Sequence, residues 1–426
     1  MTTDNRVTIS RPEDILGFIP HALGHWPKES LVAITLRGQT LGATLRVDLP
    51  PEGSEKVLAL YSRRIGEYLE ADHDADGVLL AIFSDDGWEN GGVVQGNLPL
   101  LESLELVFAR GGLALRDAWF IGSGYWRSAF CTDVECCPIP GRPVDEILDS
   151  RLNAEMVFRG SRVRESPRLL GQADEPAIDP EFLRAEDSTL EEMLRRWRGK
   201  KTFEEMLDVW MGVLDSGLPE EFDPEAEAFL RASLRVPAWR DAVVVLAAAG
   251  KGVARGGAEA FRFFSPEGDS EAALFIPPGL RCLSPAKGKP KAQRSSPAGQ
   301  SQRASGGEAP RTAAADNNAL RYGDVLLGLY PDNPDWDRLA TLDRVLAMLS
   351  RRGGGEGRAA ALTIRGWIQW CQGSGSFADE LFSQADAEQQ GYRLAELLAE
   401  VVRRGTVCGW AKSHASAWRR FGGTAA

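Results

Sequence analysis

The sequence lacks any apolar run near the roughly 20 residues that a membrane-spanning helix needs. Its first residues, MTTDNRVTISRPEDIL, also lack the basic and then apolar pattern of a secretory signal peptide. Positive charge is scarce as well, since the formal net charge is −12, which disfavours general electrostatic binding to nucleic acid or to an anionic membrane surface. These absences predict a soluble, cytoplasmic protein that binds neither nucleic acid nor membrane.

Cysteine is also scarce, at 6 of 426 residues. In a cytoplasmic protein such cysteines are more often reduced thiols or metal ligands than disulfides. Half of them fall together in the segment YWRSAFCTDVECCPIPGRP, as Cys131, Cys136 and Cys137. This segment is the densest cluster of reactive side chains in the sequence.

The N-terminal part alternates between strand and helix patterns. The runs LVAITL and LGATLRVDL, joined by the short segment RGQT, predict an antiparallel hairpin. The continuous apolar run VLLAIFS predicts a strand covered on both faces, and DAWFIGSGYWRSAF predicts a strand or strand pair bent at Gly122 and Gly124. Helical patterns separate these strands, so right-handed crossovers are expected. The predicted fold is α/β, with a mixed, mostly parallel sheet that begins with an antiparallel hairpin.

The rest of the chain is predicted to be helical around one polar interruption. Residues 284–318 hold six Lys/Arg and two Asp/Glu, about +4 in a chain of −12, and are too polar to form a core. They are interpreted as a disordered basic linker, or alternatively as an anchor for an acidic partner. The predicted domains are an α/β head (1–165), a helical region (166–283), the linker (284–318) and a helical C-terminal region (319–426).

One pattern in the last region resembles a tetratricopeptide-type helical hairpin. Gly366, Ala378, Phe382 and Ala385 follow one another at spacings of 12, 4 and 3, the spacings of the small and aromatic positions in that repeat. One copy is visible, whereas an array needs about three repeats. The pattern therefore predicts a single hairpin, suited to contact with a partner protein.

Three segments carry a resemblance to a known family. They are RPEDILGFIPHALGHWPKESLVAITLRGQTLGATLRVDLP, CTDVECCPIPGRPVD, and LTIRGWIQWCQGSGSFADELFSQA followed by GYRLAELL. Together they resemble the domain of unknown function 4192 family of high-GC actinobacteria, over most of the chain apart from the linker. The resemblance implies an α/β head followed by helices in a cytoplasmic bacterial protein, and it implies no reaction, ligand or catalytic residue.

A ligand site is expected at one edge of the sheet, because open sheets with parallel strands bind ligands beyond the carboxyl ends of the strands. Asp85 and Asp86 follow the strand VLLAIFS, and Gly91 and Gly92 follow them. If the strand that ends near Phe130 runs parallel to it, Cys131 emerges at the same edge. The glycines lack the G-x-x-x-x-G-K-[ST] and G-x-G-x-x-G phosphate-binding patterns, so a flexible connection and a solvated turn remain alternatives. Functional carboxylates here could bind Mg²⁺ or a basic group.

The cysteine cluster allows three interpretations. As metal ligands, Cys131, Cys136 and Cys137 give three thiolates, and a tetrahedral zinc would need a fourth ligand such as His21 or His25. As a nucleophile or redox switch, Cys131 would need a base or a positive neighbour. As structural thiols, all three would pack a tight loop bounded by prolines.

Three functions follow from these interpretations. The first is a binding or regulatory protein, with a small-ligand or peptide site on the head and a helical tail that holds a partner protein. The second is an enzyme that uses Asp85, Asp86 and Cys131 at the sheet edge, and the third is a module stabilised by zinc at the cysteine cluster. The sequence assigns no catalytic residue beyond the candidate Cys131 and identifies no cofactor.

Overall fold

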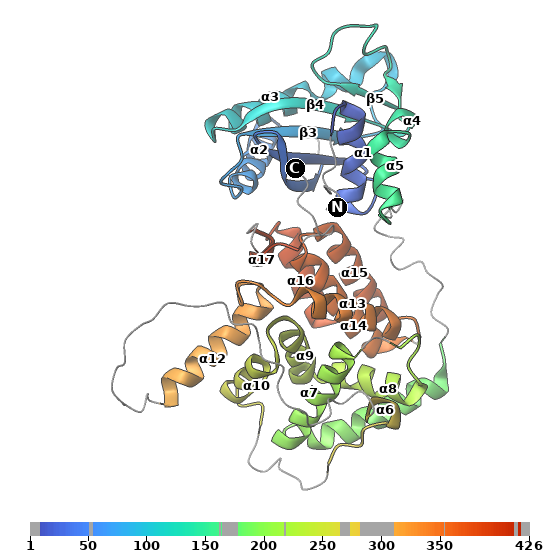
Figure 1. The fold of residues 1–426 in the computed structure, drawn as a ribbon, viewed down its shortest axis with the longest axis vertical. Coiled ribbons are helices and arrows are strands. Elements are labelled where there is room, and N and C mark those ends of the chain that lie inside the picture. The colour runs from blue at the N-terminus through green and yellow to red at the C-terminus, as the bar shows by residue number, and fades with distance from the viewer. Residues whose placement is uncertain are drawn as a thin grey trace, which may run out of the picture. The chain divides into compact units, whose positions relative to one another are not determined.

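The chain divides into two compact units, seen here in a computed structural model. That structure describes residues 9–50, 54–161, 163, 178–216, 219–264, 273–281, 311–352, 354–412 and 416–418. The first unit is Met1–Leu169 with short C-terminal pieces, and the second is Leu170–Ala411 with Ala415–Trp418. Figure 1 shows a sheet unit at the N-terminal side of the sequence and a helical unit that follows it.

The sheet of the first unit has the strand order β2-β1-β3-β4-β5-β6. Its strands are β1 (Ser30–Arg37), β2 (Thr40–Asp48), β3 (Gly77–Phe83), β4 (Ala114–Ile121), β5 (Tyr125–Ser128) and β6 (Arg142–Pro143). The predicted hairpin is confirmed, because β1 and β2 pair antiparallel. Among the described strands, β3 and β4 form the one parallel pair.

The prediction of a mostly parallel sheet is therefore wrong. The crossover from β2 through α2 (Glu55–Leu69) to β3 joins two strands that point the same way, but β1 lies between them and pairs antiparallel with both. A crossover fixes the relative direction of the strands it connects, and it does not make them neighbours. The hairpin partner β1 occupies the position beside β3 that the prediction gave to a parallel strand.

Helices cover both faces of this sheet. Alternate residues of β3 point to opposite sides, as the pleat requires. Val78, Leu80 and Ile82 join a cluster with α2 and α3 (Gly92–Arg110). Leu79, Ala81 and Phe83 join another with α1 (Pro12–Leu23) and α4 (Asp145–Leu148), and α5 (Arg151–Phe158) packs on α1. The unit is a three-layer α/β/α structure, which explains why β3 is apolar throughout.

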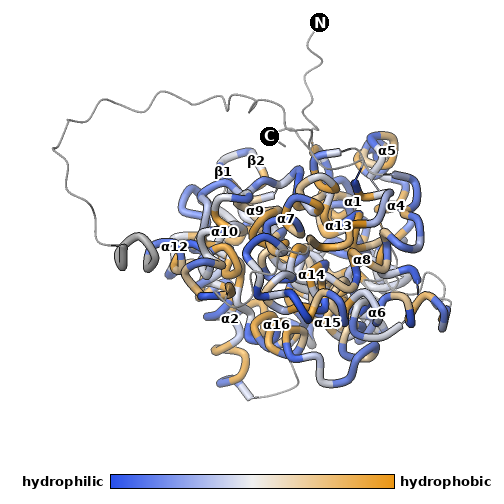
Figure 2. Tube along the Cα trace, turned by 90° about the horizontal axis from the view of Figure 1, so that it is seen from below, coloured by the Kyte–Doolittle hydropathy of each residue, from blue (hydrophilic) through white to orange (hydrophobic). Residues whose placement is uncertain are grey.

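The second unit is all-helical in its described residues. Its helices are α6 (Pro180–Arg196), α7 (Lys200–Asp215), α8 (Pro224–Leu234), α9 (Pro237–Ala249), α10 (Lys251–Ala260), α11 (Pro278–Arg281), α12 (Arg311–Leu326), α13 (Trp336–Leu349), α14 (Gly355–Cys371), α15 (Gly375–Glu388), α16 (Arg393–Arg403) and α17 (Gly409–Lys412). Hydrophobic and hydrophilic stretches alternate along these helices (Figure 2). Across the described ranges, no helix combines the length and the apolar character that crossing a bilayer requires.

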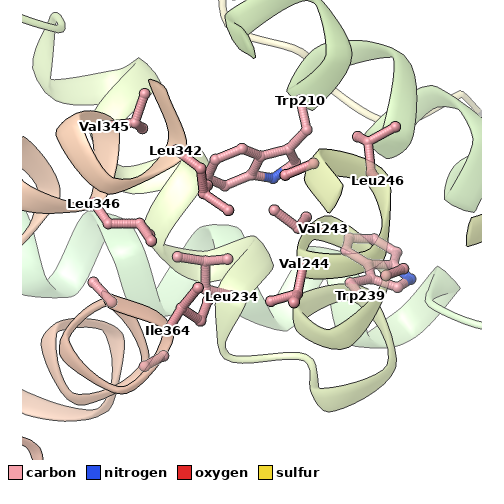
Figure 3. Packing of buried hydrophobic residues seen from close by; sticks show 14 of the residues in the cluster. Trp210, Leu234, Trp239, Val243, Val244, Leu246, Leu342, Val345, Leu346 and Ile364 are labelled. Carbon is pink, nitrogen blue, oxygen red and sulfur yellow. The ribbon is translucent and has the colours of Figure 1, made fainter. Parts of the chain in front are cut away.

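One hydrophobic cluster joins these helices from Met193 to Trp410. Figure 3 shows Trp210, Trp239, Val243, Leu342 and Ile364 among the buried residues of this cluster. Residues from before and after the predicted linker therefore contribute to the same core. The predicted disordered segment 284–318 lies outside the described residues up to position 310. The helix α12 begins at Arg311, inside this predicted segment.

Two close helix contacts explain how the later helices pack. The ring of Tyr322 in α12 occupies the space that a Cβ on Gly257 of α10 would need, and the ring of Phe382 in α15 does the same at Gly366 of α14. A helical glycine with this little space above it lets two helix axes approach closely. The assignment of this helix pair to the tetratricopeptide type stays a prediction.

Candidate functional site

The parallel strands β3 and β4 end together, where Phe83 pairs with Ile121. Asp85 follows two residues after the end of β3. Its backbone N–H donates to Glu29 Oε1 over 3.1 Å, and its Oδ1 accepts from the backbone N–H of Ser123 over 2.6 Å. The carboxylate therefore holds the turn after β4 against the end of β3. Asp86 is exposed, with its backbone N–H directed to Ser84 Oγ.

Gly91 and Gly92 form the start of α3. Gly91 is the N-cap residue and has a φ of +73°, a left-handed conformation that glycine adopts without strain. α3 then runs for 19 residues from Gly92. Its N-cap glycine provides no side-chain cap, and the Gly92 N–H is bonded to the carbonyl of Glu89. The first N–H groups of such a helix and its dipole present partial positive charge. Pro99 lies inside α3.

Arg127 is the residue of this region that the sequence prediction did not assign to the binding site. It pairs with Phe120 across β4 and β5, on the sheet face that α3 covers. Its residue is 9% exposed, and its buried Nε has no hydrogen-bond partner. A Cβ on Gly91 would lie 3.7 Å from its Nη1. The guanidinium group therefore lies beside the N-cap of α3, and no ion pair among the described residues includes it.

The strand that leads to Cys131 runs opposite to the predicted direction. β5 pairs antiparallel with β4, and β4 separates it from β3. The turn closes where Gly122 donates its N–H to the carbonyl of Tyr125 over 2.8 Å, so the glycine-rich bend reverses the chain. The premise that would bring Cys131 to the same rim as Asp85 and Asp86 is therefore wrong.

The three cysteines nevertheless come together, in the loop of residues 129–141 between β5 and β6. Their sulfur atoms all lie within 4.8 Å of one another. Cys131 is half-buried, Cys136 is exposed and Cys137 is buried. The Cys131 N–H donates to Ser128 Oγ over 3.3 Å, and the Cys137 N–H donates to the carbonyl of Asp133 over 2.7 Å. These bonds fold the loop so that the C-x4-C-C spacing becomes a single cluster, which we call the three-cysteine loop.

The thiols influence one another's ionisation. The hydrogen bond with Cys131, followed by the charges of Cys137 and Cys131, raises the pKa of Cys136 to about 11. The pKa of Cys131 is lowered, first by its hydrogen bond with the backbone of Asp133 and then by that with Cys137. Since nearby thiolates repel one another, the three do not ionise together at neutral pH unless a cation is present.

The candidate histidine ligands lie elsewhere. Both ring nitrogens of His21 have protein partners, with Nδ1 2.8 Å from Ser161 Oγ and Nε2 2.7 Å from Asn153 Oδ1. His25 is buried. Within the described part of the chain, the group of potential ligands contains the three cysteines and no histidine or carboxylate. His21 and His25 therefore do not complete a site with the cysteines.

The structure defines a class of protein with two units. One is a three-layer α/β unit that carries the α3 N-terminus and the three-cysteine loop, and the other is helical in its described residues. The chain belongs to the family described as Domain of unknown function (DUF4192), whose model matches residues 12–273 and 334–407. The match confirms the resemblance seen in the sequence. No curated protein and no solved structure matches the chain.

Proposed function

We propose that this chain is a cytoplasmic bacterial binding protein whose α/β unit holds a small anionic ligand at the N-terminus of α3. Its helical unit would hold a partner protein and so connect ligand binding to regulation. One observation supports the ligand site above the others. It is Arg127, 9% exposed and with a buried Nε that has no partner, beside the start of α3, where the N-cap glycine offers no side-chain cap.

The physical argument is that both groups need a negative partner. Burying a charge without a partner costs several kcal/mol, so buried arginines are normally paired. The N-terminus of α3 also favours negative charge. A phosphate or carboxylate between them would accept hydrogen bonds from the guanidinium and from the helix N–H groups, and the planar fork of arginine suits such oxygens. Gly91 has no side chain on the side where the guanidinium lies, and Ile139 lies on that side as well, 3.8 Å from the position that a Cβ would take.

The site is tested by calorimetric titration of the full chain with inorganic phosphate, pyrophosphate and ATP as probes. We expect saturable binding of at least one probe. Because hydrogen bonds to a charged group contribute about 1.5–3 kcal/mol, Arg127→Gln should weaken that binding by roughly 10- to 100-fold. Arg116→Gln is the matched control, since Arg116 is an arginine of β4 whose side chain is 56% exposed. Equal affinity in Arg127→Gln and the wild type would contradict the proposal, as would no binding of any probe.

Exposed leucines support the partner-binding role of the helical unit. Leu320 in α12 is 66% exposed, and Leu327 just after that helix is 59% exposed. Residues seven apart lie on one face of a helix, so both leucines present apolar surface together. We expect the full chain, used as bait, to retain a specific partner that the Leu320→Asp chain loses. Retention of the same proteins by both baits, or of none by either, would count against this role.

A further inference from the structure

We propose that Cys131, Cys136 and Cys137 form a metal site that binds one zinc ion through three thiolates and leaves the fourth coordination position open. The site is independent of the anion site at α3, because it uses different residues and a different chemistry. The fourth position would take water or a donor atom brought by a solute or partner.

The geometry is close to that of a bound metal. The three sulfur atoms lie within 4.8 Å of one another. A tetrahedral zinc with Zn–S distances of about 2.3 Å places its sulfurs about 3.8 Å apart. Rotamer adjustments that move each sulfur by less than about 1 Å would therefore suffice. The hydrogen bonds at Cys131 and Cys137 already position the two arms of the loop.

Packing alone does not account for this cluster. Cys371 and Cys408, in the helical unit, are both buried at 0% exposure, as expected of cysteines that act as small apolar side chains. Cys136 is exposed and Cys131 is half-buried, so neither gains much from apolar packing. Their sulfurs face one another in a surface loop, where a soft cation can reach them.

The ligand count argues for an open position. Structural zinc sites are closed by four protein ligands, whereas sites with three protein ligands keep a position for water or substrate. In the described residues, no histidine, aspartate or glutamate joins the three sulfurs. The loop also exposes apolar side chains beside the cluster, with Phe130 at 52%, Val134 at 68% and Ile139 at 62%. The site would therefore be accessible from solvent through a partly apolar rim.

The test is metal binding by the full chain, purified in the presence of a reductant. Equilibrium dialysis against zinc, followed by elemental analysis, should find one zinc per chain. Substitution with Co²⁺ should give a thiolate-to-cobalt absorption band. Cys136→Ala is the decisive variant, because Cys136 is exposed and its loss leaves the packing intact. We expect it to weaken zinc binding at least tenfold and to reduce the band, while Cys371→Ala, in the helical core, leaves both unchanged.

Other outcomes would overturn the proposal. They are a chain that takes up no zinc, a cobalt complex without thiolate absorption, or uptake that is the same in Cys136→Ala. A mass two hydrogens lower that survives purification in the presence of reductant, with peptide mapping that places the disulfide among Cys131, Cys136 and Cys137, would also overturn it. Arg127→Gln should bind zinc normally, so failure of the anion site and failure of the metal site are distinguishable.

Discussion

Replacing Arg231 with alanine should lower the free energy of unfolding of the helical unit by about 3–5 kcal/mol, because the change removes one of the two arginines paired with the buried Glu186 and leaves buried carbonyls without their donor. Arg231 is 0% exposed, and its Nε donates to Glu186 Oε2 over 2.7 Å. Its other nitrogens donate to the carbonyls of Leu349 (3.1 Å), Gly354 (2.9 Å) and Arg352. A single guanidinium therefore bonds to an acid of α6, to the last carbonyl of α13 and to carbonyls of the connection between α13 and α14.

Arg231 connects helices that lie far apart in the sequence. Arg231 lies in α8 and Glu186 in α6, both before position 284, whereas α13 and α14 follow position 318. Burial raises the pKa of Glu186, and the charges of Arg231 and then Arg235 oppose that effect. Without Arg231, Glu186 would be buried near a weaker source of positive charge.

Chemical denaturation followed by circular dichroism measures this effect. Arg338→Ala is the matched control, since its ion pair with Asp215 over 2.9 Å has side chains that are 30% and 43% exposed. Such an exposed pair contributes about 0–1 kcal/mol. The double variant Arg231→Met/Glu186→Leu should recover part of the loss, because it removes both charges but leaves the carbonyls of Leu349 and Gly354 without their donor. If Arg231→Ala unfolds within 1 kcal/mol of the wild type, the buried network does not hold the helical unit together in the way we describe.

Replacing Trp410 with alanine should cost about 3–5 kcal/mol, the usual range for a large aromatic residue removed from a core. Trp410 in α17 is 2% exposed. Its ring meets those of Trp336 and Trp367 edge to face, with centroids 6.1 Å and 6.0 Å away. Its Nε1 donates to the carbonyl of Pro331 over 2.7 Å. The variant loses the apolar contacts and leaves that carbonyl without this donor.

The location of the loss can also be tested. Because the chain has two units, two unfolding transitions are expected. Trp410→Ala should shift the transition of the helical unit and leave that of the α/β unit in place. Trp410→Phe should lose less, since a ring remains in the space. A shift of both transitions, or of neither, would contradict the assignment of Trp410 to the helical core.

The sequence predicted local structure better than it predicted strand partners. The segment RGQT identified the β1–β2 hairpin, and the apolar run VLLAIFS identified β3 as a strand covered on both faces. These features depend on neighbouring residues. The insertion of β1 between β2 and β3 depends on contacts between strands that are far apart in the sequence, and the period of side chains along a strand does not report them.

In the candidate sites too, the sequence predicted what depends on neighbouring residues and missed what depends on strand pairing. The convergence of Cys131, Cys136 and Cys137 could be predicted because their short spacing limits how far apart they can lie. Asp85 was correctly expected where β3 ends. Arg127 was not assigned a role in ligand binding, because its burial and its position at the N-cap of α3 come from the antiparallel pairing of β5 with β4. An arginine that follows a buried tryptophan in a short strand gives no local signal of this kind.

The central claim is that the buried charge of Arg127 is stabilised by a bound anion. It is tested most directly by the free energy of unfolding of the α/β unit at increasing phosphate concentration, in the wild type and in Arg127→Met, at constant ionic strength. The account predicts that the wild type gains stability with phosphate, as ligand linkage requires. It also predicts that Arg127→Met is at least as stable without phosphate and does not respond to it. A wild type that is insensitive to phosphate, or a variant that responds equally, would contradict the account.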